Sequence, residues 1–312
     1  MLRRLRSLRR AGVLGLNDRN RNYVMRFNPR AKFPLVDDKL ETKKLATAAG
    51  IRVPELYGVV RFQGELTHLD RLLEPRDAFV IKPAHGSGGG GVLVIDHRRN
   101  GYFVKADGRA LALGDMDFFV SNVLSGVYSL GGLPDAAMIE YRVRPNPMFD
   151  AVCYRGVPDI RLLVFRGIPA LAMIRLPTRS SDGKANLHQG AVGVGIDIAS
   201  GVTDIGVLGQ RVVTEHPDFG TPLAGYRIPD WEELLTIGAR CAEFTGLGYC
   251  GVDLVLDEAE GPMMLEINAR PGLAIQIANR CGLKRRLDLI EALERPPASV
   301  GARVDFARAT VV

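Results

Sequence analysis

Two carboxylates and a carboxamide near the carboxyl end of the chain have the types and spacing of ligands for a hard metal ion. Glu266 and Asn268 are two residues apart in the strand-like segment PMMLEINAR, so both side chains leave on the same face. The preceding strand-like segment, YCGVDLVLD, carries Asp253. Because no cysteine or histidine accompanies these oxygen atoms, the set suits Mg²⁺, or Mn²⁺ in its place, carrying substrate phosphates.

The pairing of these two segments decides whether the three side chains meet. The apolar residues of YCGVDLVLD take one face, which leaves Asp253 on the other. A turn centred between Ala259 and Glu260 then places Asp253 directly opposite Glu266. Two carboxylates this close repel each other unless a cation neutralises them. The alternative is a solvated polar face of an edge hairpin.

A second candidate site lies in the stretch VIKPAHGSGGGGVLVI, residues 80–95. Its four consecutive glycines, 88–91, stand between two β-branched apolar runs that are typical of strands. Backbone N–H groups of such a loop can approach phosphates closely because no Cβ holds them away. Lys82 ends the first strand and brings a positive charge to the same phosphates. The order differs from that of a P-loop, in which the lysine follows the glycines; the alternative is a flexible hairpin.

The elements that must position these residues can be predicted from capping and periodicity. A helix from 39 to 49 follows a cap at Asp37 or Asp38, and another runs from a cap at Asp230 to a stop at Gly246. Two further helices are expected near 272–281 and 284–293, and strands at 78–82, 92–95, 138–143, 160–165, 169–176 and 192–198. Strand-rich lobes with helices on one side, without regular alternation, predict an α+β fold.

The domain organisation follows from composition along the chain. Residues 1–36 are rich in Arg and Asn with little apolar periodicity, so we expect a basic arm and a reduced N-terminal region. A Gly-Pro cluster, residues 131–134, marks a boundary between a first lobe at 37–134, which carries the glycine-rich loop, and a second lobe at 135–295, which carries the metal site. Residues 296–312 are expected to form a tail.

Composition and charge exclude several classes of protein. At 312 residues, 46% hydrophobic and 24% charged, the chain is typical of a globular protein, and no apolar run approaches the roughly 18 residues that span a bilayer. The opening MLRRLRSLRR carries five Arg, and without them the net charge falls from +6 to +1. We expect this arm to be a solvated tail, with contact to an anionic membrane or nucleic acid as the alternative. Four cysteines without a metal-ligand pattern indicate free thiols, and a cytoplasmic protein.

With these residues in view, the chain resembles the ATP-grasp superfamily of ATP-dependent carboxylate–amine ligases, most closely the ribosomal-protein glutamate ligases and α-L-glutamate-ligase-like proteins. The resemblance implies two α+β lobes that grip ATP between them, with a shortened N-terminal region. It rests on segments in the family's order, over about 39 to 280: DDKLETKKLATAAGIRVP (37–54), FVIKPAHGSGGGGV (79–92), DIRLLVF (159–165), KANLHQGA (184–191), CGVDLVLD (250–257) and MLEINARPG (264–272).

The resemblance also implies roles for individual residues. Lys39 and Lys82 match the lysines that hold the nucleotide phosphates, and Glu140 the acid beside the adenosine. Asp253, Glu266 and Asn268 match the metal ligands. Arg161, Arg175 and Asn186 match positions beside the transferred phosphoryl group and the donor carboxylate. The mobile cover of the nucleotide corresponds to His85, Gly86, Ser87, Gly88, Gly89, Gly90 and Gly91.

Some of these residues have plainer interpretations. Lys39 suits an exposed helix position, and Arg161 and Arg175 suit ion pairs between strands. His188, in NLHQG, is expected to make a structural hydrogen bond and is left out of the catalytic set.

The chain departs from the family in two places. The usual N-terminal domain, which helps to bind the acceptor, is reduced to about 38 residues. Arg270 stands in EINARPG where the ribosomal-protein ligases have a small residue. On an extended strand its side chain leaves on the face of Glu266 and Asn268, where a guanidinium can grip a carboxyl group of an amino-acid donor. The alternative is that Arg270 pairs with a neighbouring acid.

We therefore expect an ATP-dependent ligase that forms an amide or peptide bond through an acyl phosphate, with glutamate or another amino acid as donor and an unknown amine as acceptor. The acceptor can be a peptide, a protein or a small molecule. One rival is an ATP-grasp kinase that phosphorylates a hydroxyl group, and another is a non-catalytic nucleotide-binding partner. The absence of any Ser-His-Asp or Cys-His arrangement fits phosphoryl chemistry, which asks little covalent work of side chains.

Overall fold

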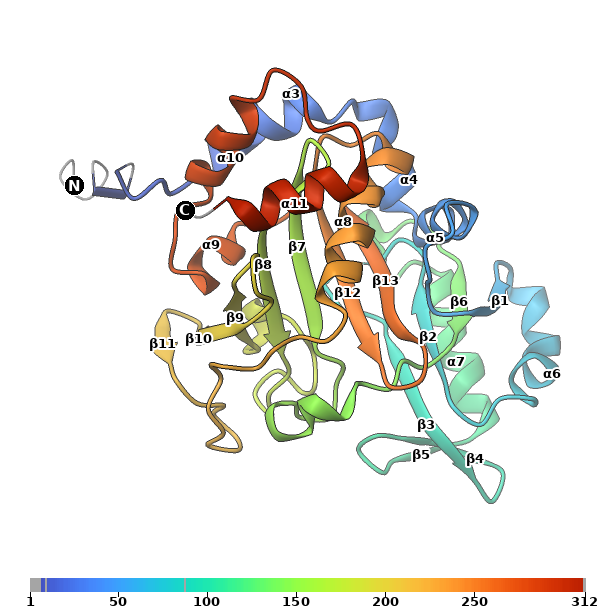
Figure 1. The fold of residues 1–312 in the computed structure, drawn as a ribbon. Coiled ribbons are helices and arrows are strands. Elements are labelled where there is room, and N and C mark those ends of the chain that lie inside the picture. The colour runs from blue at the N-terminus through green and yellow to red at the C-terminus, as the bar shows by residue number, and fades with distance from the viewer. Residues whose placement is uncertain (1–6, 9, 87, 311–312) are drawn as a thin grey trace. The chain divides into compact units, whose positions relative to one another are not determined.

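A computed structural model describes residues 7–8, 10–86 and 88–310 of the chain (Figure 1). These residues divide into two compact units. The larger unit takes the chain up to Asp37, Glu41–Arg52 and everything from Arg144 onward, and the smaller unit takes Asp38–Leu40 and Val53–Val143. Ser87 and most of the opening Arg-rich segment lie outside the described residues, so their predicted roles stay predictions.

The smaller unit is built on a six-stranded antiparallel sheet, counted over the described residues, in the order β1-β6-β2-β3-β4-β5. Its core lies where the apolar face of α7 meets the sheet, because Met116, Val120 and Val123 of that helix are fully buried beside Phe79 and Ile81. The elements are β1 Leu56–Val60, α6 Leu69–Leu73, β2 Phe79–Pro83, β3 Leu93–Arg99, β4 Tyr102–Lys105, β5 Ala110–Leu111, α7 Leu113–Leu124 and β6 Ala137–Glu140.

The boundary between the units differs from the one that we expected near residue 134. Strand β6 ends at Glu140 and lies between β1 and β2 in the smaller sheet, so it is not the first strand of the next unit. The Gly-Pro cluster is therefore a loop inside the smaller unit. Its Asp135 backbone N–H donates to Leu124 O at 3.3 Å, which returns the chain from α7 to the sheet.

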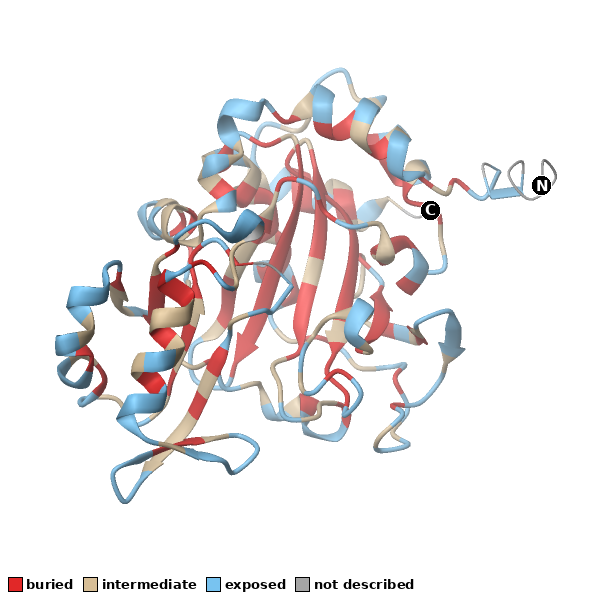
Figure 2. Cartoon of the chain, turned by 180° about the vertical axis from the view of Figure 1, so that it is seen from behind, coloured by how far each residue is buried: buried red, intermediate tan, exposed pale blue. Residues whose placement is uncertain are grey.

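The larger unit is built on a seven-stranded antiparallel sheet, again counted over the described residues, in the order β11-β10-β9-β8-β7-β12-β13. Its central strands are buried along their length (Figure 2). The strands are β7 Asp159–Phe165, β8 Ile168–Leu176, β9 Val192–Ile196, β10 Thr203–Leu208, β11 Arg211–Val213, β12 Tyr249–Asp257 and β13 Gly261–Asn268. Together the two units form the predicted α+β fold.

Helix α8 covers the larger sheet with its apolar face. In α8, Trp231–Thr245, the residues Leu234, Ile237 and Cys241 are buried, and the helix contacts β7, β12 and β8. Gly246 ends it at a φ of 67°, as expected. The other helices are α2 Leu16–Asp18, α3 Met25–Phe27, α4 Pro34–Asp37, α5 Lys39–Ala48, α9 Ala274–Ala278, α10 Leu283–Glu291 and α11 Val300–Ala309.

Of the two predicted N-terminal helix caps, one is confirmed and the other is wrong. Asp38 Oδ1 accepts a hydrogen bond from the Leu40 backbone N–H at 2.8 Å, as predicted for the start of α5. The prediction that Asp230 caps α8 with its side chain was wrong. Asp230 has a φ of 51° and makes no side-chain capping bond, because it takes the left-handed conformation that leads the chain into the buried Trp231.

Both chain ends are folded where the structure describes them, in contrast to the expected arm and tail. Tyr23, Val24 and Val36 are buried in the larger unit, and Tyr23 packs edge-on against Phe165 with ring centroids 5.4 Å apart. The helix through this region widens to a π-helix over Arg19–Val24, so its apolar residues do not follow a 3.6-residue repeat. Near the other end, α11 packs on α8 and β8.

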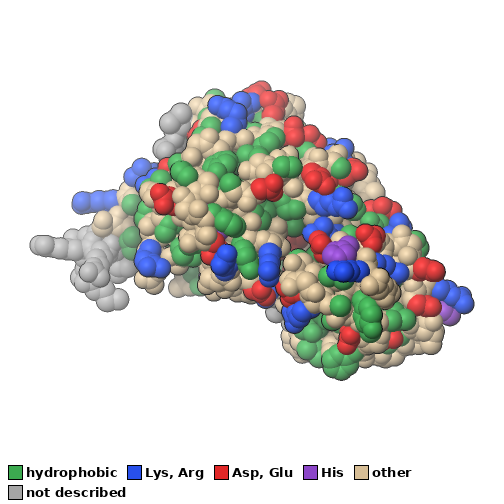
Figure 3. All heavy atoms as spheres, turned by 90° about the horizontal axis from the view of Figure 1, so that it is seen from below, with side chains coloured by type: hydrophobic (Ala, Val, Ile, Leu, Met, Phe, Trp, Pro, Cys, Tyr) green, Lys and Arg blue, Asp and Glu red, His purple; other side chains and the backbone are tan. Residues whose placement is uncertain are grey.

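The surface carries both signs of charge. On the face drawn in Figure 3, Lys and Arg side chains are interspersed with Asp and Glu side chains. None of the helices in the described ranges combines the length and the apolar character needed to cross a membrane.

Candidate active site

A row of charged side chains crosses one face of the larger sheet. Strand pairing sets Asp159 of β7 opposite Arg175 of β8, and Arg161 of β7 opposite Asp253 of β12. The next pairing sets Asp253 opposite Glu266 of β13. Residues two apart on one strand share a face, so these cross-strand pairs form one continuous row. We call these residues, together with Asn268, the charged row.

The predicted pairing of Asp253 with Glu266 is confirmed, but the turn beyond it differs from the expected one. Near the turn, Asp257 pairs with Gly261, which centres the turn on Ala259. The register shifts by one residue between Asp253 and Leu254, so β13 accommodates one extra residue before Glu266. Because of this β-bulge, Asp253 still lies opposite Glu266, as it would with a regular hairpin whose turn is centred between Ala259 and Glu260.

Ion pairs hold the row together. Arg161 makes a two-pronged contact with Asp253, in which Nη2 donates to Oδ2 at 2.7 Å and Nε donates to Oδ1. Arg175 grips Asp159 in the same way and also lies 3.0 Å from Asp253 Oδ2 through Nη2. The side chains of all four are at most 14% exposed, so the charges are largely removed from water. The contacts therefore agree with the plainer interpretation, in which Arg161 and Arg175 make ion pairs between strands.

Burial and charge shift the two aspartates in opposite directions. Burial raises the pKa of Asp159 to about 7, against the attraction of Arg175. Burial also acts to raise the pKa of Asp253, but the charges of Arg161 and Arg175 outweigh it and hold that pKa below its usual range. The difference arises because Asp253 meets two arginines, whereas Asp159 meets one closely.

The donor set at the β13 end of the row fits a hard cation. Asn268 Nδ2 donates to Glu266 Oε1 at 3.0 Å and to Asp253 Oδ2 at 3.5 Å, so the three side chains meet, with the amide nitrogen and not the predicted oxygen of Asn268 facing the carboxylates. Among the described residues no group of three or more His, Cys, Asp or Glu side chains could hold a metal, so a metal here would need Asn268 as its third ligand. Two carboxylates and one amide oxygen are a suitable set for Mg²⁺.

Asn186 lies in the loop that leaves the sheet directly after β8, the strand that carries Arg175. Its Oδ1 accepts from the His188 backbone N–H at 3.0 Å and so starts the turn Leu187–Gln189. Thr178 and Ser181, both buried, bind each other's backbone in the same loop.

Arg270 does not leave on the face of the metal ligands as expected, because β13 ends at Asn268. Its side chain is 53% exposed, and Nη2 lies 3.1 Å from Asp37 Oδ2, while the guanidinium stacks over the ring of Phe33. The structure therefore has the alternative arrangement, a pair with a neighbouring acid. A role toward the donor stays a prediction.

Sequence reasoning missed the residues that fasten the segment after Asn268. Asn28 is buried and donates through Nδ2 to Ala269 O at 2.8 Å and to Tyr249 O at 2.6 Å, while its Oδ1 accepts from the Tyr249 N–H at 2.9 Å. Arg19 Nη1 donates to Pro271 O at 2.8 Å. The N-terminal region thus supports the segment directly after Asn268, the last of the predicted metal ligands. The sequence marks Asn28 only as a polar residue before Pro29.

The predicted nucleotide residues lie in the smaller unit. Lys82 of β2 and Glu140 of the neighbouring strand β6 form an ion pair of 2.5 Å, with side chains 13% and 4% exposed. Lys39 donates through Nζ to Gly86 O and lies 3.5 Å from Ala84 O. The two lysines that were expected to hold phosphates are thus held by acceptors of the protein itself.

The ends of the glycine-rich loop require glycine. A Cβ on Gly86 would collide with the ring of Pro83, and one on Gly91 would collide with Tyr128. Gly91 also has a φ of 70°, a conformation that other residues rarely adopt. Both ends are therefore packed closely against protein, unlike the ends of a free spacer.

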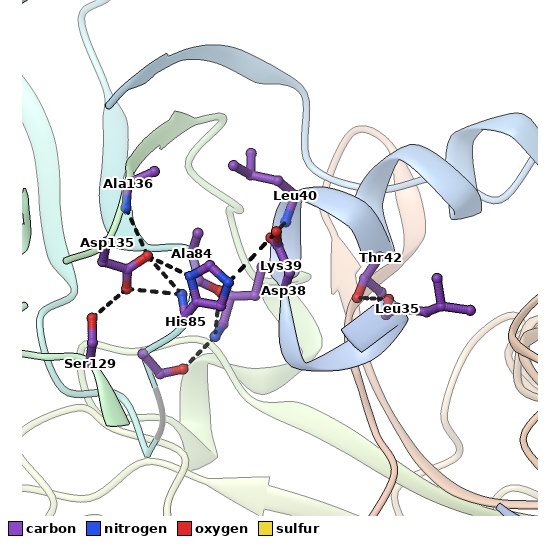
Figure 4. Close-up of polar contacts among 11 residues, drawn as sticks. Leu35, Asp38, Lys39, Leu40, Thr42, Ala84, His85, Ser129, Asp135 and Ala136 are labelled. Carbon is purple, nitrogen blue, oxygen red and sulfur yellow. Dashed lines mark hydrogen bonds and ion pairs between the residues drawn. The ribbon is translucent and has the colours of Figure 1, made fainter. Parts of the chain in front are cut away.

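His85 lies at the start of this loop and contacts a residue that the sequence did not reveal. Its Nδ1 is 2.8 Å from Asp135 Oδ1, and its backbone N–H donates to Asp135 Oδ2 at 3.0 Å (Figure 4). On its other side, Nε2 is 3.7 Å from Asp38 Oδ2.

Comparison with known sequences adds a family and two relatives. The model of a family described as sugar-transfer associated ATP-grasp matches residues 18–292, which is most of the chain. A protein of Maridesulfovibrio salexigens named a probable alpha-L-glutamate ligase is 32% identical over 115 residues, 37% of this chain and 27% of that protein. A protein of the same name from Stenotrophomonas maltophilia is 42% identical over 59 residues, 19% of this chain and 20% of that protein. The chain thus matches less than a third of the length of either relative.

Solved structures with a similar arrangement include the ATP-grasp ligase PsnB with its minimal precursor, at 13% identity and a TM-score of 0.44, over 90% of this chain and 62% of that chain. The D-alanine–D-alanine ligase of Bacillus anthracis with ATP is 14% identical, with a TM-score of 0.47, over 83% of this chain and 65% of that chain.

Proposed function

The chain belongs to the family of sugar-transfer associated ATP-grasp proteins, and we propose that it is an ATP-dependent ligase that joins a carboxylate to an amine. The observation that carries the proposal is the charged row, in which two arginines, three carboxylates and an amide lie together on one face of a sheet. A protein that only binds a nucleotide has no need of that arrangement. We place the reaction in the cytoplasm, where the four free cysteines stay reduced.

In this proposal the donor carboxylate attacks the γ-phosphate of ATP and forms an acyl phosphate with release of ADP. The amine then attacks the acyl carbon and displaces inorganic phosphate, which leaves an amide. Lys39 and Lys82 bind the phosphates, and Arg161 and Arg175 stabilise the charge that spreads over the transferred phosphoryl oxygens. Mg²⁺ held by Asp253, Glu266 and Asn268 supplies neutralising charge to the phosphates.

The lysines and arginines must exchange partners for this chemistry. Lys82 is paired with Glu140, and Lys39 with backbone carbonyls, so a phosphate oxygen has to compete with acceptors already in place. Carbonyl oxygens are neutral and are the weaker competitors for a lysine. We therefore propose that Lys39 exchanges its acceptors for a phosphate oxygen more readily than Lys82 does when the nucleotide binds.

Arg270 is our candidate for recognition of the donor. Its pair with Asp37 is half-exposed, and exposed pairs are weak enough for a second carboxylate to replace Asp37. Arg270→Lys should raise the donor KM with little change in ATP affinity, because lysine keeps the charge but loses the fork. Unchanged donor kinetics would remove Arg270 from the donor site.

The proposal is tested by a phosphate-release screen of amino acids as donors against peptides, amines and amino sugars, followed by mass spectrometry of the product. A ligase releases phosphate and forms a product lighter by one water than the two substrates combined. A phosphorylated acceptor without free phosphate would make the protein a kinase instead. Glu266→Gln should abolish the Mg²⁺-dependent release and leave the fold intact, since it removes one charge at the open end of the row.

A further inference from the structure

We infer that Asp135 is a positioning residue, which fastens the start of the glycine-rich loop so that the loop can cover nucleotide phosphates. The carboxylate has no exposed side-chain surface and accepts four donors. These are the His85 N–H, His85 Nδ1, Ser129 Oγ at 2.6 Å and the Ala136 N–H at 2.8 Å (Figure 4). Two of the four come from the residue directly before Gly86.

The segment around Ser129 supports both ends of the loop. Gly86 pairs with Ser129 in an isolated β-bridge. Gly91 packs against the ring of Tyr128, the residue before Ser129. Ser129 is in turn bound to Asp135 through its hydroxyl. One short segment therefore contacts the loop where it begins and where it ends, and Asp135 connects that segment to His85.

The fastening also reaches Lys39. The Lys39 backbone N–H donates to Ala84 O at 3.1 Å, and its Nζ donates to Gly86 O. Ala84 and Gly86 flank His85, so the position of His85 sets the position of both carbonyls. If Asp135 is removed, two donors of His85 lose their acceptor, and the Gly86 carbonyl that accepts from Lys39 Nζ is held less firmly, whereas Ala84 keeps its own N–H bond to Ala136 O at 3.0 Å.

This arrangement predicts a local effect that does not depend on knowing the substrates. When a loop is ordered for only part of the time, the apparent dissociation constant equals the intrinsic constant divided by the fraction of time for which the loop is ordered. Hydrogen bonds to a charged group contribute enough to change such a population by roughly tenfold. The part of the inference that concerns ATP rests on the proposed function, whereas the part that concerns the loop does not.

The test is hydrogen exchange of peptides covering residues 84–92 in the full chain, with wild type, Asp135→Ala and Asp135→Asn. We expect exchange about tenfold faster in Asp135→Ala and a smaller change in Asp135→Asn, because an amide keeps one acceptor and can donate to Ser129 Oγ. Val120→Ala is the control, since Val120 lies in the core of the same unit and makes none of the hydrogen bonds that join Asp135 to His85, Ser129 and Ala136. Unchanged exchange at 84–92, or acceleration spread over the unit as in the control, would overturn the inference.

Calorimetry with ATP and MgCl₂, and separately with AMP, gives the second readout. Asp135→Ala should weaken the affinity for ATP about tenfold and leave the affinity for AMP nearly unchanged, because the proposed role of the loop is to cover the outer phosphates. Equal weakening of both nucleotides would indicate general damage and count against the inference. If Asp135→Ala does not fold, Ser129→Ala takes its place with a smaller expected effect. Failure of the wild type to bind ATP would remove the proposed function, and the exchange result would still decide the role of Asp135.

Discussion

The charged row of the larger unit is held by strand pairing, whereas the lysines of the smaller unit are held by one strand neighbour and a loop. In the row, Asp159 and Asp253 each face an arginine, and Glu266 faces Asp253, because the register of β8, β7, β12 and β13 sets them there. In the smaller unit, Lys39 is oriented by carbonyls at the start of a glycine-rich loop, and that loop is fastened through His85. The first arrangement is part of the sheet, and the second depends on side-chain contacts outside it.

The difference teaches where each region can tolerate change. Buried charges fixed by a sheet cannot move away when a partner is lost, so loss of one partner leaves its neighbours unpaired at high cost. Lysines bound to carbonyls and a single carboxylate can exchange those acceptors for phosphate. We therefore expect substitutions of the four ion-paired residues of the row, Asp159, Arg161, Arg175 and Asp253, to affect folding and chemistry together. Substitutions in the smaller unit should affect mainly binding.

The largest effect is expected from Asp253→Ala. It removes the acceptor of Arg161 and one acceptor of Arg175 in a site less than 15% exposed, which should cost about 3–5 kcal/mol of stability and abolish turnover. Urea unfolding followed by fluorescence measures this, because Trp231, the single tryptophan, is buried in the larger unit. Asp204→Ala, which breaks the exposed pair with Arg280, is the control and should cost about 0–1 kcal/mol. Similar costs for the two variants would remove the distinction between row and surface.

Lys82 gives the matching experiment in the smaller unit. The double variant Lys82→Met, Glu140→Gln removes both charges and retains the approximate volume, so stability should change by no more than about 1 kcal/mol. ATP affinity should fall roughly 100-fold, because charge-assisted hydrogen bonds contribute about 1.5–3 kcal/mol. Calorimetry with ATP and MgCl₂ measures the affinity. Wild-type affinity in the double variant would exclude Lys82 from the nucleotide site.

The pairing of the predicted metal ligands was easier to predict from the sequence than the residues that hold the neighbouring segments in place. Alternation along two strands fixed the face of Asp253 and Glu266, and their pairing was right even though the turn was misplaced, because the bulge in β13 compensated. Nothing in that alternation showed that Arg161 and Arg175 would both converge on Asp253, since strand order depends on contacts distant in sequence. Asp159 was visible only as part of the segment DIRLLVF, without a role.

The supports were hidden for identifiable reasons. Asp135 follows Gly-Gly-Leu-Pro, a context that indicates a turn, and a turn aspartate is usually solvated. Asn28 lies in a region where a π-helix disrupts the apolar repeat, so the region appeared unfolded. In both cases the signal is a single polar residue whose importance depends on burial, and burial here arises from segments more than 40 residues away.

An intermediate effect is expected from Asn28→Ala, which tests whether the N-terminal region supports the row. The change leaves the Tyr249 N–H and two carbonyls without the amide that binds them, which should cost about 1–3 kcal/mol by Trp231 fluorescence. Because Ala269 follows the ligand Asn268, the Mg²⁺ concentration needed for half-maximal activity should also rise. Asn22→Ala, on an exposed face of the same helical region, is the control and should be within about 0.5 kcal/mol of wild type. Equal behaviour of the two variants would make the N-terminal region independent of the row.

The smallest effect, and the sharpest contrast between the regions, is expected from pH. Burial acts to raise the pKa of Asp135, but hydrogen bonds from Ser129 and His85 outweigh it and lower that pKa below its usual value. A lowered pKa gives stability that is present above about pH 4 and is lost as the pH falls through the folded-state value.

In the row the sign is opposite: burial raises the pKa of Asp159 to about 7, so its contribution is present near pH 4 and is lost as the pH rises through 7. The stability difference between wild type and Asp135→Asn should therefore shrink below pH 4, and that between wild type and Asp159→Asn should shrink between about pH 4 and 7. Urea titrations at four pH values measure both differences, with circular dichroism following the whole chain and Trp231 fluorescence following the larger unit. Differences that move in the same direction with pH would show that the two regions hold their acids in the same way.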